Sequence, residues 1–579
     1  MPNNTVKLLK ISFICSALAV SEGAFASQQN GMATNDTLQL SGEKRANTHI
    51  VSAQVTPESP ALSAKESKRE LQELLSKQIK PIYTEQLFRL YSANNIQPLW
   101  QDKKAVQNFK KQLVDLSLAG VQPQFSKWLL QLNSPELSAM EQDIVLSDAM
   151  LGYLHFINNL NNKGESWLYR QNTYTLAAPP SDSIDKWQQH IKDNSLNDYI
   201  LALLPNHSMY ENMRSEMLKQ LSDTQPWPEF LMKETLRPGQ NNKNVMELRN
   251  ILIRSGYLEP SAVKAENQLY NQELVAAVKR FQSLHGLLAD GVIGQATKVW
   301  LNTTPKTRAR IMALNMQRLR IIPEEHSTAI LVNIPNYSLL YYLDGKEVLS
   351  SKVAVGRPSR KTPIMSSELN NVVINPPWTV PVSMTRKDIA PRAMRDPNYF
   401  SSRGYTVFSS WSNDATAINP SSINWGEITP GNFPYRIRQA PGPTNSLGRF
   451  KFNMPNSEAI YLHDTPNKAA FSREMRAISS GCVRVNKAPE LANMLLGNAG
   501  WNEGRVNNTL KTWKTTYVNI PKRIPVFLYY QTAWVDEEGK PQYRADIYEY
   551  DVNARQKSEL VSQVLATVRD SLTASKETT

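Results

Sequence analysis

The pattern of hydrophobic and polar positions divides the 579-residue chain into segments of different character. Between residues 66 and 235, apolar side chains recur at helical spacing, as at Leu71, Leu75 and Ile79, with little Gly or Pro between them. This periodicity predicts an all-helical first domain. The preceding segment, 27–65, is rich in Ser, Thr and Asn and has no apolar period, which is typical of a flexible linker.

Residues 236–303 form a second helical unit. Apolar positions such as Val245, Leu248 and Leu274 lie on one face of each expected helix, which predicts amphipathic helices packed around a small core. Asp290–Gly291 predicts a tight turn ahead of the last helix.

From about residue 326 the pattern changes to short β-rich runs, with Asp344–Gly345 as a hairpin turn. We assign 304–551 to a β-rich domain and 552–579 to a closing helix and tail. Residues 385–445, rich in Ser, Asn, Pro and Gly, interrupt this domain as a long structureless insertion, a feature that is usually functional or mobile. The predicted fold class is therefore multidomain α+β.

Residues 1–26 have the pattern of a cleavable export signal. Lys7 and Lys10 precede the apolar stretch Ile11–Val20, and Ala24–Phe25–Ala26 supplies the small residues of a cleavage site. The apolar stretch is shorter than the roughly 20 residues that a membrane-spanning helix needs. We predict an exported protein with no transmembrane segment once the signal is removed.

Removal of this signal leaves Cys482 as the only cysteine of the mature chain. Exported proteins meet an oxidising compartment, so a single thiol there is a buried small hydrophobe, an intermolecular bridge or a reactive group. The formal net charge is +13, and about +12 without the signal, which carries Lys7, Lys10 and Glu22. This charge favours an anionic polymer as partner over nucleic acid, because no dense basic tract is present, although a generically basic surface is an alternative.

A histidine near Cys482 would make the thiol a candidate nucleophile. Of seven histidines, only His463 lies inside the β-rich domain near the cysteine, and 18 residues separate the two. His463 ends one strand-like run and Cys482 begins another, so adjacent strands would bring imidazole and sulfur together for proton transfer. No HExxH, CxxC, Walker or dinucleotide-binding motif is present, so we predict neither a metal nor another cofactor.

The residues beside the cysteine suggest further roles. Gly481 permits a tight turn whose backbone N–H groups would stabilise an oxyanion. Arg484 lies on the same strand face as Cys482 and would bind a substrate carboxylate or form a structural salt bridge. Tyr461 lies on the face of His463, as a wall of the pocket or as a core residue.

These residues resemble the active-site signature of the L,D-transpeptidases with a YkuD-type catalytic domain. The resemblance includes His463, Thr465, Ser479, Gly481–Arg484, Thr362–Pro363, Asn375–Trp378, Pro441–Pro443 and Leu447–Gly448. Two positions depart from the family pattern. Ser480 stands where many members have His, and Asp464 stands where many have Gly.

The helical segments resemble the other domains of large Gram-negative members. Residues 236–303 are similar to a three-helix peptidoglycan-binding domain, through Gly256–Leu258, Phe281–Gln282 and Asp290–Gly291 among others. Tyr91–Trp100 is similar to their scaffold domain, and the insertion 385–445 to the lid over their cleft.

The resemblance implies a peptidoglycan enzyme of the periplasm that acts in cell-wall biogenesis and cell shape. Cys482 would attack the L-centre of diaminopimelate in a tetrapeptide stem, release D-Ala, and form a 3→3 cross-link with an acceptor stem. Other wall-synthesis enzymes are expected as partners. The implied site comprises His463, Gly481 and Cys482 as catalytic residues, with Tyr461, Trp425, Ser479, Ser480 and Arg484 binding substrate.

Several alternatives share this sequence pattern. Water as acceptor would make a carboxypeptidase, a lysine amine would attach a lipoprotein, and a free D-amino acid would give exchange. A non-catalytic wall-binding scaffold is a further alternative, against which the retention of both Cys482 and His463 argues.

Overall fold

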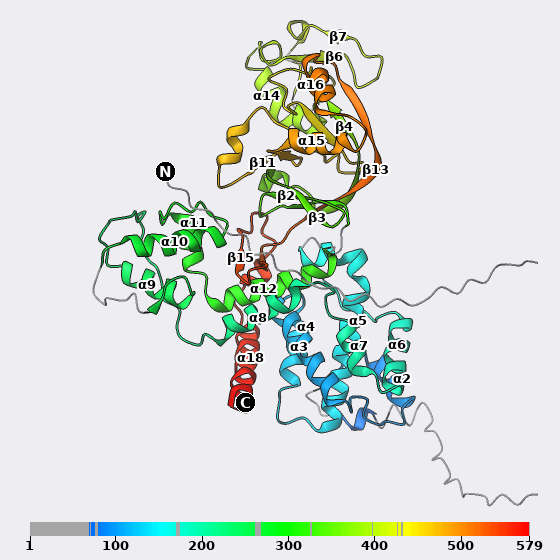
Figure 1. Ribbon diagram of the computed structural model, residues 1–579. Coiled ribbons are helices and arrows are strands. Elements are labelled where there is room, and N and C mark those ends of the chain that lie inside the picture. The colour runs from blue at the N-terminus through cyan, green and yellow to red at the C-terminus, as the bar shows by residue number, and fades with distance from the viewer. Residues whose placement is uncertain are drawn as a thin grey trace, which may run out of the picture. The chain divides into compact units, whose positions relative to one another are not determined.

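The computed structural model describes residues 69, 71–75, 79–169, 174–260, 268–322, 324, 327–396, 398–424, 427–429 and 432–577. All of them belong to one compact unit, Ala61–Thr579. The predicted signal peptide, the whole of the predicted linker and Trp425 lie outside the described residues. The described chain has a helical region, a small helical module and a β-rich region, so the multidomain α+β prediction is confirmed (Figure 1).

The first region is helical, as its periodicity predicted. Its 30-residue helix α5 begins with a capping box, in which the Ser138 side chain accepts from the Glu141 N–H and the Glu141 side chain accepts from the Ser138 N–H. The helices are α2 Thr84–Ser92, α3 Lys103–Ala119, α4 Pro123–Gln131, α5 Ala139–Leu168, α6 Ser181–Lys192, α7 Leu196–Ala202 and α8 Met209–Ser222.

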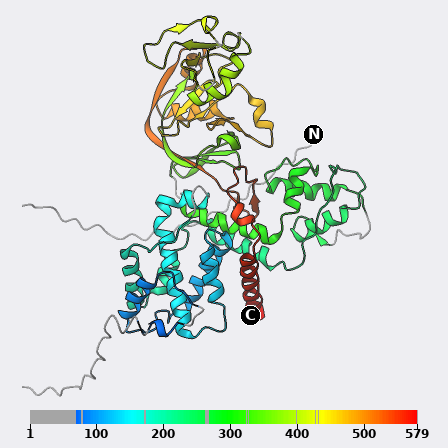
Figure 2. The ribbon, with the colours of Figure 1, turned by 180° about the vertical axis from the view of Figure 1, so that it is seen from behind.

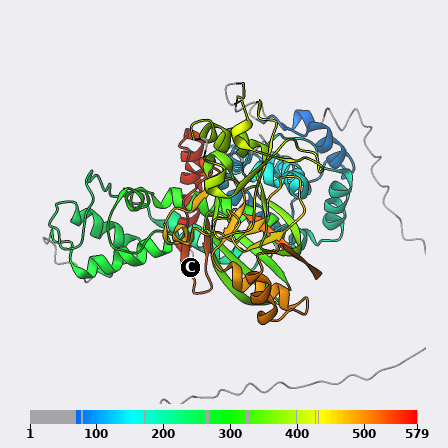
Figure 3. The ribbon, with the colours of Figure 1, turned by 90° about the horizontal axis from the view of Figure 1, so that it is seen from above.

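The second region contains α9 Val245–Arg254, α10 Gln272–Leu284 and α11 Gln295–Leu301. Seen from above, these green helices gather in a bundle of their own (Figure 3). Val245, Leu248 and Leu274 are buried in its core, as their spacing predicted. Helix α12, Pro305–Arg318, follows and packs against α8 and α3 of the first region.

The β-rich region is built on a nine-stranded sheet of order β11-β3-β12-β10-β9-β4-β13-β1-β2. A further pairing between β2 and β3 closes eight of these strands into a barrel, in which the long β13 curves along one side (Figure 2). The strands are β1 Ala329–Asn333, β2 Ser338–Leu343, β3 Lys346–Gly356, β4 Met365–Ile374, β9 Phe450–Asn453, β10 Leu462–His463, β11 Ala477–Ser479, β12 Val483–Val485 and β13 Thr516–Tyr529. Helix α15, Ala488–Gly497, contacts β4, β9 and β13, and α16, Glu503–Lys511, packs beside α15.

The insertion 385–445 differs from the structureless segment expected from its composition. A second, four-stranded sheet of order β5-β8-β6-β7 crosses it, with its own apolar core that includes Phe400, Val407 and Ile437. Two short elements, β5 Trp378–Thr379 and α13 Val382–Met384, precede the insertion. The insertion itself contains η4 Thr385–Ile389, α14 Ala390–Ala393, β6 Tyr405–Phe408, β7 Ala417–Ile418 and β8 Arg436–Gln439. The apolar residues scattered among the turn-forming ones form this core.

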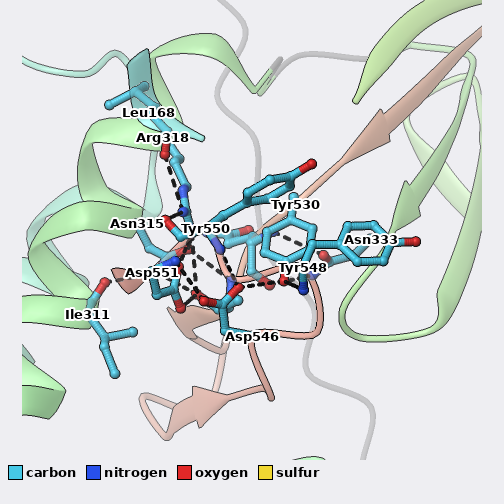
Figure 4. A network of polar contacts seen from close by, with 12 residues as sticks. Leu168, Ile311, Asn315, Arg318, Asn333, Tyr530, Asp546, Tyr548, Tyr550 and Asp551 are labelled. Carbon is cyan, nitrogen blue, oxygen red and sulfur yellow. Dashed lines mark hydrogen bonds and ion pairs between the residues drawn. The ribbon is translucent and has the colours of Figure 1, made fainter. Parts of the chain in front are cut away.

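After β13 the chain leaves the sheet through the hairpin β14 Ala533–Val535 and β15 Pro541–Tyr543. A fully buried ion pair then joins Arg318 of α12 to Asp551 at 2.7 Å (Figure 4). Helices α17 Val552–Arg555 and α18 Glu559–Glu577 follow, and α18 contacts α3, α4 and α8. The predicted domain boundaries remain predictions.

Candidate active site

Three neighbouring strands bring the candidate catalytic residues together on one face of the barrel. Strand β10 is parallel to β12, with His463 paired to Arg484, and antiparallel to β9, with His463 paired to Lys451. Because side chains alternate along a strand, Tyr461 and Cys482 extend the same face. The alternate residues on these strands are buried on the other face, in the barrel core: Phe452, Leu462 and Val483.

The imidazole of His463 is buried and oriented by the main chain. Its Nδ1 lies 2.5 Å from the carbonyl oxygen of Asp464, so Nδ1 carries the proton and Nε2 is left as the acceptor. Burial and the charge of Arg484, followed by Lys451, lower the pKa of His463 to about 3 against the effect of this hydrogen bond. The imidazole is therefore neutral at physiological pH, as a general base must be.

The thiol of Cys482 is partly buried, and its Sγ lies 3.8 Å from the carbonyl oxygen of Ala459. Burial raises the pKa of this thiol, whereas hydrogen bonds from Tyr461 and the charges of Lys451 and Arg484 lower it. The net direction is upward, so the resting thiol is protonated at neutral pH.

The turn before the nucleophile is held by a compact set of hydrogen bonds. Gly481 has φ +122°, a conformation that suits glycine. Its N–H donates to Ser479 Oγ at 3.1 Å, and Ser479 Oγ donates to the Cys482 carbonyl at 2.6 Å. Thr362 Oγ1 donates to the Gly481 carbonyl at 2.6 Å. The Cys482 N–H has no acceptor among the residues that the structure describes, which leaves it available to an oxyanion.

Two cations flank this face. Lys451 Nζ lies 4.3 Å from the centroid of the Tyr461 ring, and Arg484 Nε is buried without a hydrogen-bond partner. Neither side chain forms an ion pair with a carboxylate in the described part of the chain. For Arg484, the structural salt bridge considered from sequence is therefore absent within that part. The positive charge around the thiol is left for an anionic ligand.

Tyr461 connects the barrel to the insertion. Its ring lies 5.7 Å from the His463 ring and packs against both apolar cores. Its hydroxyl group hydrogen-bonds with Trp378 and Cys482. Tyr461 is thus both a packing residue and a wall of the site.

Ser480 links the nucleophile turn to the insertion by another route. Its Oγ accepts from Arg360 at 3.1 Å, and Arg360 also forms a close ion pair with Asp388 of η4. Arg357 adds a second contact to Asp388 at 3.6 Å. The insertion is therefore held by charge directly beside the turn that carries Cys482.

The sequence-predicted residues Tyr461, His463, Ser479, Ser480, Gly481, Cys482 and Arg484 all gather here, while Trp425 lies outside the described residues. Lys451 and Trp378 have no assigned role from sequence reasoning, and both contact Tyr461. The alternation Phe450–Lys451–Phe452 marks Lys451 as facing away from the core, but only the pairing of β9 with β10 places it beside His463.

Among the described residues, no group of three or more His, Cys, Asp or Glu side chains could hold a metal ion. No described helix combines the length and the apolar character required to cross a bilayer.

A thiol and a neutral imidazole on adjacent strands, with a free N–H beside the sulfur, define the site of a cysteine acyl-transfer enzyme. Family comparisons agree with this class. Residues 327–520 match the L,D-transpeptidase catalytic domain, 85–217 match a scaffold domain, and 241–301 match the "Putative peptidoglycan binding domain".

Among similar proteins is a "Putative L,D-transpeptidase" from Haemophilus influenzae, 36% identical over 475 residues, which are 82% of this chain and 79% of that protein. The chain therefore belongs to the L,D-transpeptidase family, and it is a peptidoglycan L,D-transpeptidase that acts as a cysteine acyltransferase.

Solved L,D-transpeptidases show weaker overall likeness. The one from Xylanimonas cellulosilytica is 16% identical, covers 53% of this chain and 100% of its own, and has a TM-score of 0.16. The one from Stackebrandtia nassauensis is 13% identical, covers 52% and 96%, and has a TM-score of 0.18. Family membership therefore rests on the sequence matches.

Proposed function

We propose that this enzyme forms 3→3 cross-links between diaminopimelate residues of peptidoglycan stems, through a thioester on Cys482 and with release of D-Ala. The observation that carries the proposal is the placement of His463 on β10 and of Cys482 directly before the adjacent parallel strand β12. Two cations, Lys451 and Arg484, flank them and pair with no carboxylate among the described residues. A tetrapeptide stem is anionic and matches this charge.

In the first half-reaction, the Cys482 sulfur attacks the carbonyl carbon of the L-centre of diaminopimelate. The thiol proton passes to Nε2 of His463, and the Cys482 N–H stabilises the oxyanion. The Gly481 N–H would join it only by giving up its bond to Ser479 Oγ. Collapse of the intermediate breaks the peptide bond, and the D-Ala amine leaves with the proton from His463.

In the second half-reaction, the side-chain amine of diaminopimelate in another stem attacks the thioester carbonyl. His463 takes a proton from this amine and returns it to the sulfur as the carbon–sulfur bond breaks. The products are a new amide bond and the free Cys482 thiol, so no oxidant or cofactor is consumed.

The two cations would orient the donor. A donor tetrapeptide carries one carboxylate at the terminal D-Ala and another at the D-centre of diaminopimelate. Arg484 and Lys451, on opposite sides of His463, would hold these groups and so place the scissile carbonyl beside Cys482.

We place this reaction in the periplasm, on the basis of the export signal predicted over 1–26. The peptidoglycan-binding match at 241–301 supports a peptidoglycan substrate. Contacts with other wall-synthesis enzymes, and an effect on cell shape, belong to the same proposal.

The decisive experiment incubates the chain without residues 1–26, and its Cys482→Ala variant, with a disaccharide-tetrapeptide and resolves the products by mass. A dimer lighter by one D-Ala than two donors, absent with Cys482→Ala, is expected. A donor whose diaminopimelate side-chain amine is acetylated is the matched substrate control, because it can acylate Cys482 but cannot accept.

Each other product would change the proposal in a defined way. Tripeptide monomer alone would make the enzyme a carboxypeptidase, and incorporation of an added D-amino acid would make it an exchange enzyme. A folded protein that binds sacculi but leaves the donor intact would favour the non-catalytic scaffold.

A further inference from the structure

Tyr548 lies beyond the matched catalytic family segment, which ends at residue 520, yet its hydroxyl group contacts the loop that supports the nucleophile turn. The Tyr548 hydroxyl donates to the Gly356 carbonyl at 2.6 Å and accepts from the Thr362 N–H at 3.0 Å. Tyr548 is nearly fully buried, so these two bonds are shielded from water.

Thr362 passes this restraint to the residue before the nucleophile. Its backbone N–H is held by Tyr548, its Oγ1 accepts from the Gly356 N–H at 2.8 Å, and the same Oγ1 donates to the Gly481 carbonyl at 2.6 Å. Thr362 is fully buried. Three bonds thus fix Thr362 in the orientation in which it holds the Gly481 carbonyl.

The Gly481 carbonyl and the Cys482 N–H belong to one peptide group. Because a peptide group is planar, a hydrogen bond that fixes its oxygen also fixes the direction of its N–H on the opposite side. The Cys482 N–H is the free donor beside the sulfur. Thr362 and Tyr548 therefore determine where this donor points.

The other side of Tyr548 is anchored to the buried ion pair shown in Figure 4. The Tyr548 N–H donates to the Tyr530 hydroxyl at 3.0 Å, and that hydroxyl donates to Asp546 at 2.7 Å. Asp546 accepts from the Asp551 N–H at 2.7 Å, and Asp551 is paired with Arg318. Arg318 in turn donates to the Leu168 carbonyl of α5 at 3.3 Å, so the contacts reach the helical region.

We propose that Tyr548 is a positioning residue for the acyl-transfer reaction, which aims the Cys482 N–H at the developing oxyanion through Thr362 and the Gly481 carbonyl. Tyr548, in the segment after β13, then influences the reaction through Thr362 and the Gly481 peptide group.

The test compares two reactions of the same thiol, neither of which needs a peptidoglycan stem. Acylation by p-nitrophenyl acetate passes through a tetrahedral oxyanion, whereas alkylation by iodoacetamide does not. Loss of N–H alignment should slow acylation only. Rates are normalised to titrated Cys482 thiol, and the Cys482→Ala rate is subtracted, so that oxidised protein and reactions at other residues do not contribute.

Tyr548→Phe keeps the ring and removes the hydroxyl. We expect its acylation rate to fall by about 10- to 100-fold, the range of a misaligned catalytic donor, while alkylation changes by less than about twofold. Tyr550→Phe is the matched control, because Tyr550 lies in the same aromatic cluster, 4.8 Å from the Tyr530 ring, and only its backbone contacts Asp546 and Arg318. The substitution removes a hydroxyl group that has no part in the described chain of hydrogen bonds. It should leave both rates unchanged.

Thr362 provides an independent pair of variants. Thr362→Val, which removes the donor to Gly481, should reproduce the selective loss, and Thr362→Ser, which retains the hydroxyl, should restore most of the acylation rate. The Tyr548→Phe/Thr362→Val double variant should lose little more than Thr362→Val alone, because both act on the same N–H.

Three outcomes would overturn the inference. These are unchanged acylation in Tyr548→Phe, an equal fall of acylation and alkylation, or an equal effect of Tyr550→Phe. Since the ester probe contains no stem peptide, a failure of the 3→3 proposal would leave this result unaffected.

Discussion

The buried pair of Arg318 and Asp551 allows a test of how burial changes the contribution of an ion pair to the free energy of unfolding. Both side chains are 0% exposed and their charged atoms lie 2.7 Å apart. Asp551→Asn keeps an oxygen acceptor of nearly the same shape but removes the negative charge. Arg318 would then lose its directly paired carboxylate in the interior, with Asp546 as a more distant negative charge.

The matched control is a pair of similar geometry near the surface. Arg254 and Asp223 lie 2.6 Å apart, and both side chains are 23% exposed. Loss of one partner of a buried pair costs about 3–5 kcal/mol, whereas a surface pair contributes about 0–1 kcal/mol. For a unit of this size, about 1 kcal/mol shifts the melting temperature by about 1 °C, so we expect Asp551→Asn to lower it by about 3–5 °C and Asp223→Asn by less than about 1 °C.

Thermal unfolding of the full chain, followed by tryptophan fluorescence at one fixed scan rate, measures this difference. The double variant Arg318→Met/Asp551→Leu removes both charges and should recover most of the loss, because an apolar pair needs no desolvation. Equal shifts for Asp551→Asn and Asp223→Asn would refute the argument from burial. A double variant as unstable as the single would show that the hydrogen bonds matter more than the charges.

Other parts of the site give further predictions. Burial holds the pKa of His463 near 3, against about 6.5 when unfolded, so the unfolded chain binds the extra proton and stability should fall by about 1.4 kcal/mol per pH unit from about pH 6.5 downward. The melting temperature of His463→Gln across this range should depend less on pH, and an equal slope would contradict the assignment. Gly481→Ala should lower the turnover rate at least tenfold. At φ +122° alanine is strained by about 1–3 kcal/mol, and its Cβ would lie 3.3 Å from Ile460. A turnover rate equal to that of the wild type would be inconsistent with this strain. Arg360→Gln should loosen Asp388, and hydrogen exchange over 385–396 should become about fivefold faster, whereas unchanged exchange would mean that the ion pair does not hold the insertion. Binding to isolated sacculi should weaken as salt rises from about 0.15 M to 1 M, since the Debye length falls from about 8 to 3 Å; salt-independent binding would rule out the charge as its cause.

Local sequence patterns predicted those parts of the fold in which the interacting residues are close together in the sequence. Asp344 and Gly345 form a hairpin turn with φ values of 49° and 76°, as their residue types indicated. The adjacency of β10 and β12 also followed from sequence, because His463 and Cys482 each bounded a strand-like run, whereas their parallel direction comes from the structure. The connection between them contains a 3₁₀ turn, Lys468–Ser472, and strand β11.

Properties that depend on strand pairing could not be predicted. Lys451 is ten residues from Tyr461 in the sequence and contacts its ring only because β9 and β10 pair in one register. Tyr548 reaches the Gly356 carbonyl 192 residues away, a contact for which no local pattern exists. The apolar core of the insertion could not be predicted, because its strands are too short to show an alternation of apolar and polar residues.

The charge state of the site follows from these long-range neighbours. Burial raises the pKa of the Cys482 thiol and lowers that of the His463 imidazole. It therefore opposes proton transfer from the thiol to the imidazole, because it disfavours both the thiolate and the imidazolium that the transfer would form. Lys451 and Arg484 stabilise a thiolate, but they also destabilise an imidazolium, so the two effects largely offset each other within the pair. A preformed thiolate–imidazolium pair would add a third positive charge to a buried, already cationic face. The geometry therefore favours proton transfer during the attack on the carbonyl, when an anionic stem lies against the cations and the new negative charge moves from sulfur to an oxygen beside the Cys482 N–H.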